Sequence, residues 1–403
     1  MKPTVIVIGS ADVIKLGLIR SVGVIGYKVV SIHLVGSTKA KCFRLTPLDY
    51  YSKYISAYYY STADNLIDLL INKCSEKDQK PVLIPLDDKS VYLIDQSNHI
   101  LDDYFLYANV NHQEGGIIHL MNKSLQKKLA VEAGLNVAKG WEIPIVNGNY
   151  IIPKDIEYPC FVKGLFSYHS SKRYQCKCND AQELHIFLSQ CLQSGAFSLF
   201  AEEYLSVEQE KGVIALSCGN NCTIPAIADF IEEGKGSSNG VSMFGRINHL
   251  DGQDGLSRSI QRFIKSLHYT GICNIDFIES NGNLYFVEIN FRYAAYGYGV
   301  FLAGVNLPAM FVNALLCVDI EGEKQLSVNG KTYFNEKIGI FNLMEKYISY
   351  EKYRELKKSA DFRLIENSID PKPYHMLWSL IVTRFLILIK LKIKKLLFFI
   401  RYK

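Results

Sequence analysis

The sequence predicts an α/β protein, because strand and helix patterns alternate near the start of the chain and a β-ribbon pattern follows later. Residues 5–8 and 27–33 read as strands, and residues 10–12 open a helix between them. Residues 271–290 read as two strands joined by Asn281-Gly282, a dipeptide typical of tight hairpin turns. The 403 residues suffice for two or three compact units with a substantial core.

The first unit carries acidic residues at the end of a predicted strand. Residues 82–85 form that strand, and Asp87 and Asp88 follow at its carboxyl end. We expect them either to contact an amine-bearing substrate or to cap the next helix. The segment Gly9-Ser10-Ala11 lacks the second and third glycines of the dinucleotide fingerprint, which disfavours an NAD-dependent oxidoreductase.

The predicted ribbon brings three oxygen ligands to one place. Glu288 and Asn290 are two residues apart on a strand and therefore share a face, and Asp276 lies on the partner strand. The neighbouring residues are apolar enough to be buried, and a buried carboxylate needs a cation or a strong partner. Two carboxylates and an amide suit Mg²⁺ or Mn²⁺. Arg292 continues this face and could offset the charge of a transferring phosphoryl group.

Three segments upstream supply further binding groups. Lys123 begins a predicted helix, and Lys163 ends a predicted strand before a polar loop in which Ser170 and Ser171 offer donors to phosphate oxygens. Residues 200–205, Phe-Ala-Glu-Glu-Tyr-Leu, form the next candidate strand end. Together with the ribbon, the sequence therefore holds four candidate binding segments.

In this order, the four segments resemble the ATP-grasp superfamily, and the residues after Arg292 are similar to its D-aspartate ligase-like branch of carboxylate–amine ligases. The resemblance covers about residues 80–310. It implies an N-terminal Rossmann-like pre-ATP-grasp unit and two ATP-grasp subdomains that clasp ATP. The loop after Lys163 departs from the family pattern, because it has one glycine where family members often have several.

The resemblance also implies roles for individual residues. Lys123 and Lys163 would contact the nucleotide phosphates, with Lys163 and Arg292 as the catalytic residues. The adenine would pair with the hinge formed by Glu202, Glu203, Tyr204 and Leu205. A ribose-binding acid would be Glu208 or Glu210, which spacing alone does not separate.

The sequence pattern and the resemblance divide the chain into five segments. They are the N-terminal unit 1–115, the small ATP-grasp subdomain 116–198, the second subdomain with the metal site 199–325, an extension 326–370 and a tail 371–403. The glycine-rich segment 229–246 is predicted to be either a mobile cover or an exposed turn. In a cover, Lys235 and Arg246 would bind a substrate carboxylate. Tyr293, Tyr296 and Tyr298 are predicted to pack rather than to take part in chemistry.

The tail differs in charge from the rest of the chain. Residues 376–403 hold seven basic residues and no acidic one, whereas the whole chain has a net charge of +5. The folded body is therefore not basic, and nucleic-acid binding is discounted. The uncharged stretch before Arg384 is too short to cross a bilayer. We expect the tail to be a basic hydrophobic helix lying at the membrane surface, with docking on another protein or in a homodimer as the alternative.

The resemblance implies a reaction in which ATP phosphorylates a carboxylate and an amine acceptor then attacks the acylphosphate. The tail suggests a membrane-linked glycan or cell-envelope precursor as substrate. The alternatives are a carboxyphosphate- or thioester-forming reaction, or a non-catalytic nucleotide-binding module at the membrane. A first strand without a preceding signal segment and ten scattered cysteines predict a cytoplasmic protein, peripheral on the inner face of the cytoplasmic membrane.

Overall fold

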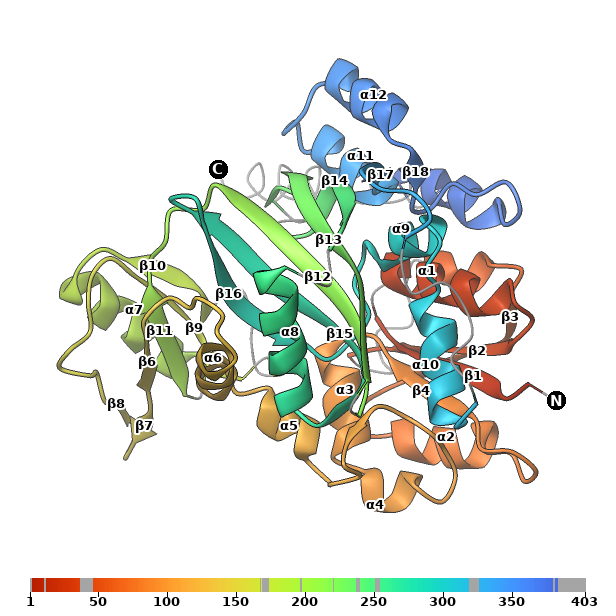
Figure 1. Cartoon of the computed structure of the whole chain (residues 1–403), viewed down its shortest axis with the longest axis horizontal. Helices are drawn as coiled ribbons and strands as arrows, with labels where there is room; N and C mark the ends of the chain where they lie inside the picture. Colours follow the sequence, from red (N-terminus) through yellow and green to blue (C-terminus); the bar gives the residue numbers. More distant parts are fainter. Residues whose placement is uncertain are drawn as a thin grey trace, which may run out of the picture.

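The computed structural model confirms the predicted mixed α/β architecture, which is built on three main β-sheets (Figure 1). It describes residues 2–10, 12–36, 46–166, 168, 174–195, 198–219, 221–236, 240–250, 254–318, 326–379 and 381–382. Ser170, Ser171 and the basic part of the tail from residue 383 onward lie outside these ranges.

The N-terminal unit is a parallel sheet in the order β3-β2-β1-β4. Its strands β1 and β4 are buried along their whole length, because apolar runs of this kind are covered on both faces of a parallel sheet. Its strands are β1 (Thr4–Gly9), β2 (Lys28–Leu34), β3 (Ile55–Ser61) and β4 (Val82–Pro85), and its helices include α1 (Asp12–Gly23), α2 (Leu66–Cys74), α3 (Asp88–Asp95) and α4 (Asn98–Leu101).

A second, smaller sheet is antiparallel and has the order β10-β9-β11-β6. Side chains from these strands and from α7 form a core separate from that of the rest of the molecule. The elements are β6 (Gly140–Ile143), β9 (Cys160–Gly164), β10 (Cys176–Cys178), β11 (Leu199–Glu203) and α7 (Ala181–Gln193). A two-stranded ribbon of β7 (Ile145–Val146) and β8 (Asn149–Tyr150) extends from this part.

The large sheet has the order β16-β15-β12-β13-β14-β17-β18, with β5 (Asn109–Val110) pairing with β15. The strands from the predicted extension, β17 and β18, thus continue this sheet. The bounds are β12 (Gln209–Cys218), β13 (Asn221–Glu233), β14 (Ser242–His249), β15 (Tyr269–Ser280), β16 (Asn283–Asn290), β17 (Lys331–Phe334) and β18 (Phe362–Arg363).

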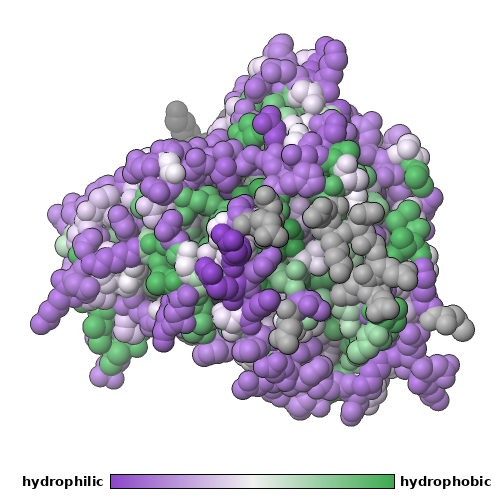
Figure 2. Space-filling model, in the orientation of Figure 1, coloured by the Kyte–Doolittle hydropathy of each residue, from purple (hydrophilic) through white to green (hydrophobic). Residues whose placement is uncertain are grey.

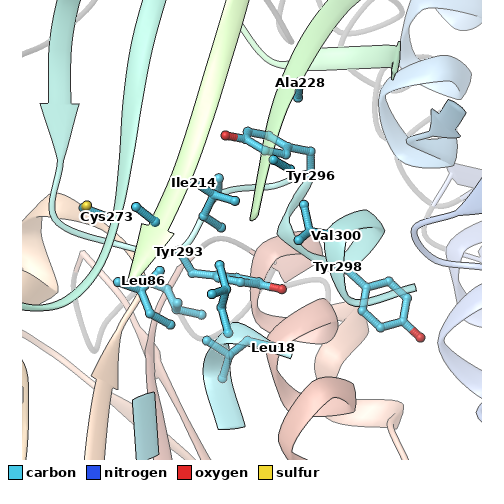
Figure 3. Close-up of a cluster of buried hydrophobic side chains, with 14 of the residues drawn as sticks. Leu18, Leu86, Ile214, Ala228, Cys273, Tyr293, Tyr296, Tyr298 and Val300 are labelled. Carbon is cyan, nitrogen blue, oxygen red and sulfur yellow. The ribbon is translucent and has the colours of Figure 1, made fainter. Parts of the chain in front are cut away.

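Helices cover the large sheet and connect it to its neighbours. The strongly amphipathic α8 (Gly255–Ser266) buries Ile260 and Phe263 against it, and α6 (Lys123–Glu132) lies beside β16. The remaining helices here are α5 (Gly116–Leu120), α9 (Gly297–Leu302) and α10 (Leu307–Leu315). Figure 3 shows Tyr293, Tyr296 and Tyr298 among the buried side chains of the largest core, so their predicted packing role is confirmed.

The extension is tied to the N-terminal unit by a buried ion pair. Arg20 on α1 places its Nε 3.0 Å from Asp370 Oδ2, and the two side chains are 2% and 1% exposed. Ser52 and the main chain of Lys53 also donate to the Asp370 carboxylate. The extension contains α11 (Glu336–Met344) and α12 (Tyr350–Ser359), and a helix over 372–379 lies at the start of the predicted tail.

The surface around the extension is polar. Figure 2 shows an almost entirely hydrophilic area over α12, with smaller hydrophobic areas on other parts of the same face. In the part of the chain that the structure describes, no helix combines the length and the apolar character that crossing a bilayer requires.

Candidate nucleotide and metal site

One face of the large sheet gathers the polar residues that the sequence singled out. Directly opposite residues of antiparallel strands share a face. The register pairs Gly212 with Asp276, Asp276 with Glu288, and Asn274 with Asn290. We call this side of β12, β15 and β16 the ribbon face. The predicted convergence of Asp276, Glu288 and Asn290 is present there.

The two carboxylates of the ribbon face converge on one amide nitrogen. Asn290 Nδ2 lies 2.8 Å from Asp276 Oδ2 and 3.4 Å from Glu288 Oε1. Asn274 Nδ2 donates to the other oxygen of Asp276 over 2.6 Å. The Asn290 nitrogen therefore stands where a positive charge would be shared between the carboxylates.

Burial and mutual repulsion separate the pKa values of the two acids. Burial, followed by the nearby Glu288 carboxylate, raises the pKa of Asp276 to about 7. Burial alone would also raise the pKa of Glu288, but Lys123, Lys163 and Arg292 outweigh it and lower that pKa to about 2. Near neutral pH, the two carboxylates together therefore carry between one and two negative charges on average.

We expect divalent-cation binding at this pair to strengthen as the pH rises through 7, because the raised pKa of Asp276 keeps it partly protonated below that value. The same shift favours folding of the metal-free protein at low pH, and this contribution is lost as the pH rises through about 7. Calorimetric titration of Mg²⁺ with ADP at pH 6 and pH 8 measures the effect. If the ratio of Mg²⁺ affinity at pH 8 to that at pH 6 is the same in Asp276→Asn as in the unsubstituted protein, the pH dependence does not come from Asp276.

Helix α6 delivers Lys123 to the ribbon face. Asn122 caps the helix by accepting from the main chain of Ser124 and Leu125, and Lys123 follows directly. The Gln126 side chain exchanges hydrogen bonds of 3.1 and 3.2 Å with the main chain of Ile289, which fixes α6 against β16. As a result, Lys123 Nζ lies 2.6 Å from Glu288 Oε2 and its side chain is 4% exposed.

Glu202 forms ion pairs with two buried lysines, Lys163 and Lys127. Its oxygens lie 2.7 Å from Lys163 Nζ and 2.8 Å from Lys127 Nζ. Burial would raise the pKa of Glu202, but the two ammonium groups lower it, so that it stays ionised. The resemblance implies nucleotide contacts for Lys163 and Glu202 but none for Lys127. Its spacing of four from Lys123 places both lysines on one face of α6 and was the available signal.

A pocket of about 280 Å³ lies beside these lysines, between the hinge and the large sheet. Its walls are mostly apolar, which suits the faces of an aromatic base. Glu203, Tyr204 and Leu205 of the predicted hinge all line it. The remaining lining residues are Lys127, Ala138, Phe161, Glu202, Val207, Glu210, Ile278, Tyr285, Phe286 and Val287.

The structure distinguishes the two acids that spacing left open. Glu208 is exposed and accepts from the main chain of Asn281 over 2.9 Å, so it braces the ribbon turn. Glu210 lines the pocket. Burial, followed by the neighbouring Glu233 carboxylate, raises the pKa of Glu210, while Lys235 opposes this shift. Lys235 therefore lies close enough to influence the pocket.

Arg246 lies on the opposite face of the sheet from the carboxylate pair. It is exposed on β14 directly opposite Asp229, which in turn is opposite Lys211. Lys211 pairs with Asp229 and Glu279 on that far side. Of the two basic residues predicted to hold a substrate carboxylate, the structure brings only Lys235 near the site.

The two aspartates after β4 have different contacts. Asp87 caps α3 by accepting from the main chain of Ser90, and its other oxygen accepts from Ser10, so the helix-capping alternative describes it. Asp88 accepts from Arg292 Nε over 2.9 Å. The N-terminal unit thereby contributes a carboxylate that orients Arg292 beside the ribbon face.

The residues present fit a magnesium-like cation only with help from ligands outside the protein. Within the described ranges, no group of three or more His, Cys, Asp or Glu side chains is placed to hold a metal. The ribbon face offers two carboxylates and an amide, and Mg²⁺ commonly takes one or two carboxylates and completes its shell with phosphates and waters. The donor set therefore matches a cation that arrives with a nucleotide.

Comparison with known proteins finds likeness in fold. No family model and no curated protein sequence matches the chain. N5-carboxyaminoimidazole synthetase from Staphylococcus aureus, in complex with ADP, is 18% identical and superposes with a TM-score of 0.60 over 88% of each chain.

Two further solved structures are similar to this chain in fold. L-amino acid ligase from Bacillus licheniformis is 13% identical, with a TM-score of 0.55 over 78% of this chain and 74% of that one. A biotin carboxylase–beta-gamma-ATP complex from Campylobacter jejuni is also 13% identical, with a TM-score of 0.56 over 78% of this chain and 71% of that one. With its predicted motifs brought together on this scaffold, the chain has the ATP-grasp fold.

Proposed function

We propose that the protein is an ADP-forming carboxylate–amine ligase. The observation that carries this proposal is the convergence of the carboxylate pair, Lys123 and Lys163 beside a pocket of base size. Solved proteins of the same fold include an amino acid ligase and a synthetase that binds ADP. The D-aspartate ligase-like branch and the predicted domain boundaries remain predictions.

In this proposal, the adenine occupies the pocket and pairs with the hinge main chain, and Glu210 holds the ribose. Lys123 and Lys163 then lie along the phosphates, where their ammonium groups offset negative charge. Asp276, Glu288 and Asn290 would hold Mg²⁺ or Mn²⁺, which neutralises phosphate charge when bound. To serve as a ligand, Asn290 would have to present its amide oxygen in place of the nitrogen that now donates to the two carboxylates.

The substrate carboxylate would approach the γ-phosphorus from the side of Arg292. Asp88 fixes the Nε side of that guanidinium, so its position is set before substrate arrives. The carboxylate oxygen attacks the γ-phosphorus and ADP leaves. The amine then attacks the carbonyl carbon of the acylphosphate and expels phosphate, giving an amide. In this mechanism the protein side chains position the substrates and stabilise the developing charge, and none forms a covalent bond to a substrate.

A screen of phosphate release tests this function. Purified protein receives Mg²⁺ and ATP with pairs drawn from amino acids, small carboxylates and amino sugars. We expect at least one pair to give ADP, phosphate and an amide detected by mass spectrometry. Release of AMP, or binding of Mg·ADP without turnover by any pair, would replace the proposal with another reaction class or with a non-catalytic module.

Glu210→Gln is expected to weaken ADP binding about tenfold, because it exchanges a charged hydrogen bond of about 1.5–3 kcal/mol for a neutral one of about 0.5–1.5 kcal/mol. A difference of about 1.4 kcal/mol corresponds to a factor of ten. The matched variant Glu208→Gln should leave ADP affinity unchanged, since that side chain braces the ribbon turn. Calorimetry of both variants measures the difference. If only Glu208→Gln weakens ADP binding, the ribose is held by Glu208 and not by Glu210.

We propose that the tail brings this cytoplasmic ligase to the inner face of the cytoplasmic membrane and a membrane-linked glycan or envelope precursor. Leu377 and Ile381 pack inward, while Trp378 and Val382 are exposed just before the basic segment. Each basic residue near an anionic surface contributes about 1 kcal/mol.

Vesicle sedimentation tests the role of the tail. The full chain should bind phosphatidylglycerol vesicles more strongly than phosphatidylcholine vesicles. A chain ending at residue 382 should lose that preference. An unchanged preference would rule the tail out, and tail-dependent dimerisation without vesicle binding would favour docking on a second copy.

A further inference from the structure

Tyr296 lies in the core, but its hydroxyl reaches the ribbon face. The side chain is 3% exposed, and its ring centroid lies 5.6 Å from that of Phe230 and 6.4 Å from that of Tyr333. Figure 3 shows Tyr296 near Ala228 of β13. Its hydroxyl donates to Asn274 Oδ1 over 2.7 Å. A packing residue thus contacts the neighbour of Asp276 with its polar end.

Asn274 links this hydroxyl to the carboxylate. Its Nδ2 donates to Asp276 Oδ1 over 2.6 Å. An amide turned the other way would set oxygen against oxygen at the carboxylate, so Asp276 itself requires Asn274 to donate to it. By donating to the amide oxygen, the Tyr296 hydroxyl holds the Asn274 side chain where its nitrogen reaches Asp276. Asn290 holds the second oxygen of the same carboxylate, so two amides fix its direction.

The neighbouring strand is shaped to let Tyr296 reach Asn274. Gly212 lies opposite Asp276, and a Cβ there would stand 2.8 Å from the Tyr296 hydroxyl oxygen and 2.7 Å from Phe230. Both distances are shorter than ordinary carbon contacts. A larger residue at position 212 would displace the tyrosine ring or the hydroxyl. The hydroxyl contact therefore depends on the absence of a side chain at this position.

Resting on the proposed function, we propose that Tyr296 is a positioning residue that acts through Asn274 to hold Asp276 ready for a divalent cation. Partners that orient metal ligands typically change metal affinity 10- to 100-fold. Burial raises the pKa of Tyr296 well above its usual value, so the hydroxyl remains a donor at neutral pH. Tyr296 thus sets the direction of a ligand without touching the cation.

Manganese binding in the presence of ADP, followed by electron paramagnetic resonance, tests this role without measuring turnover. Tyr296→Phe removes only the hydroxyl and should weaken Mn²⁺ binding about tenfold or more. Tyr333→Phe is the matched control, because its hydroxyl lies in the same core but pairs with Ser242. It should bind Mn²⁺ like the unsubstituted protein. Equal affinity in the two variants would overturn the proposal.

A double-mutant cycle tests the route through Asn274. Asn274→Ala should weaken Mn²⁺ binding by a similar factor, and adding Tyr296→Phe should cause no further loss. Independent, additive losses would overturn the route. An unchanged affinity in Asn274→Ala would also overturn it, and this can be measured even if Tyr296→Phe fails to fold. Absence of Mn²⁺ binding by the unsubstituted protein would refute the proposed function as well. Normal binding by that protein and by Tyr296→Phe would refute only the positioning role.

Discussion

Glu288→Gln is expected to slow ADP formation by about 100- to 1,000-fold, the cost typical of removing one electrostatic group from a preorganised site. The substitution keeps the shape of the side chain but removes the charge that faces Lys123 at 2.6 Å. It also leaves Asp276 as the only carboxylate of the pair. The rate is measured with the substrate pair that gives most phosphate in the screen.

Glu279→Gln serves as the matched control for this variant. Glu279 belongs to the same ribbon but pairs with Lys211 on the far side of the sheet, 3.1 Å away. Its loss should leave the rate of ADP formation close to that of the unsubstituted protein. Near-normal turnover in Glu288→Gln would remove the basis for placing the cation at this pair.

Asp370→Ala is expected to lower the free energy of unfolding by about 3–5 kcal/mol, because it leaves a buried guanidinium without its counter-charge. Among the described residues, Arg20 would keep the main-chain carbonyls of Leu364 and residue 370 and the Tyr298 ring, none of which carries a counter-charge. Ser52 and the Lys53 main chain would lose their acceptor as well. Urea unfolding followed by circular dichroism measures the loss.

Two further variants separate charge burial from a general sensitivity to mutation. Glu355→Gln removes one partner of an exposed pair with Lys352, and we expect no measurable change. Arg20→Met combined with Asp370→Leu should recover much of the lost stability, since apolar residues can replace a buried pair. An unfolding midpoint in Asp370→Ala equal to that in Glu355→Gln would contradict the role of the ion pair.

The ribbon face could be predicted because it depends on local rules. A hairpin turn at Asn281-Gly282 and the two-residue alternation of a strand set Glu288, Asn290 and Asp276 on one side. Glu208 and Glu210 share that spacing but have different contacts, because β12 begins only at Gln209 and Glu208 precedes the strand. Spacing predicts a shared face only for residues within one element.

The remaining contacts depend on how distant parts of the chain dock. The Asp88–Arg292 pair joins residues 204 positions apart, and it forms only when the N-terminal unit packs against the large sheet. The sequence predicts the helix that carries Lys127 but not a role for this lysine, because its partner Glu202 lies on β11 of the small sheet. Spacing places Lys127 on the same face of α6 as Lys123, but it does not identify a partner that comes from a distant segment.

The link between Arg20 and Asp370 also has a consequence for biosynthesis. A ribosome makes the N-terminal unit before the extension, and the counter-ion for its buried arginine is added only 350 residues after that arginine. The nascent unit must keep that guanidinium hydrated until then, so its final packing comes late. Products of premature termination upstream of residue 370 would carry an exposed defect that quality-control proteases can recognise.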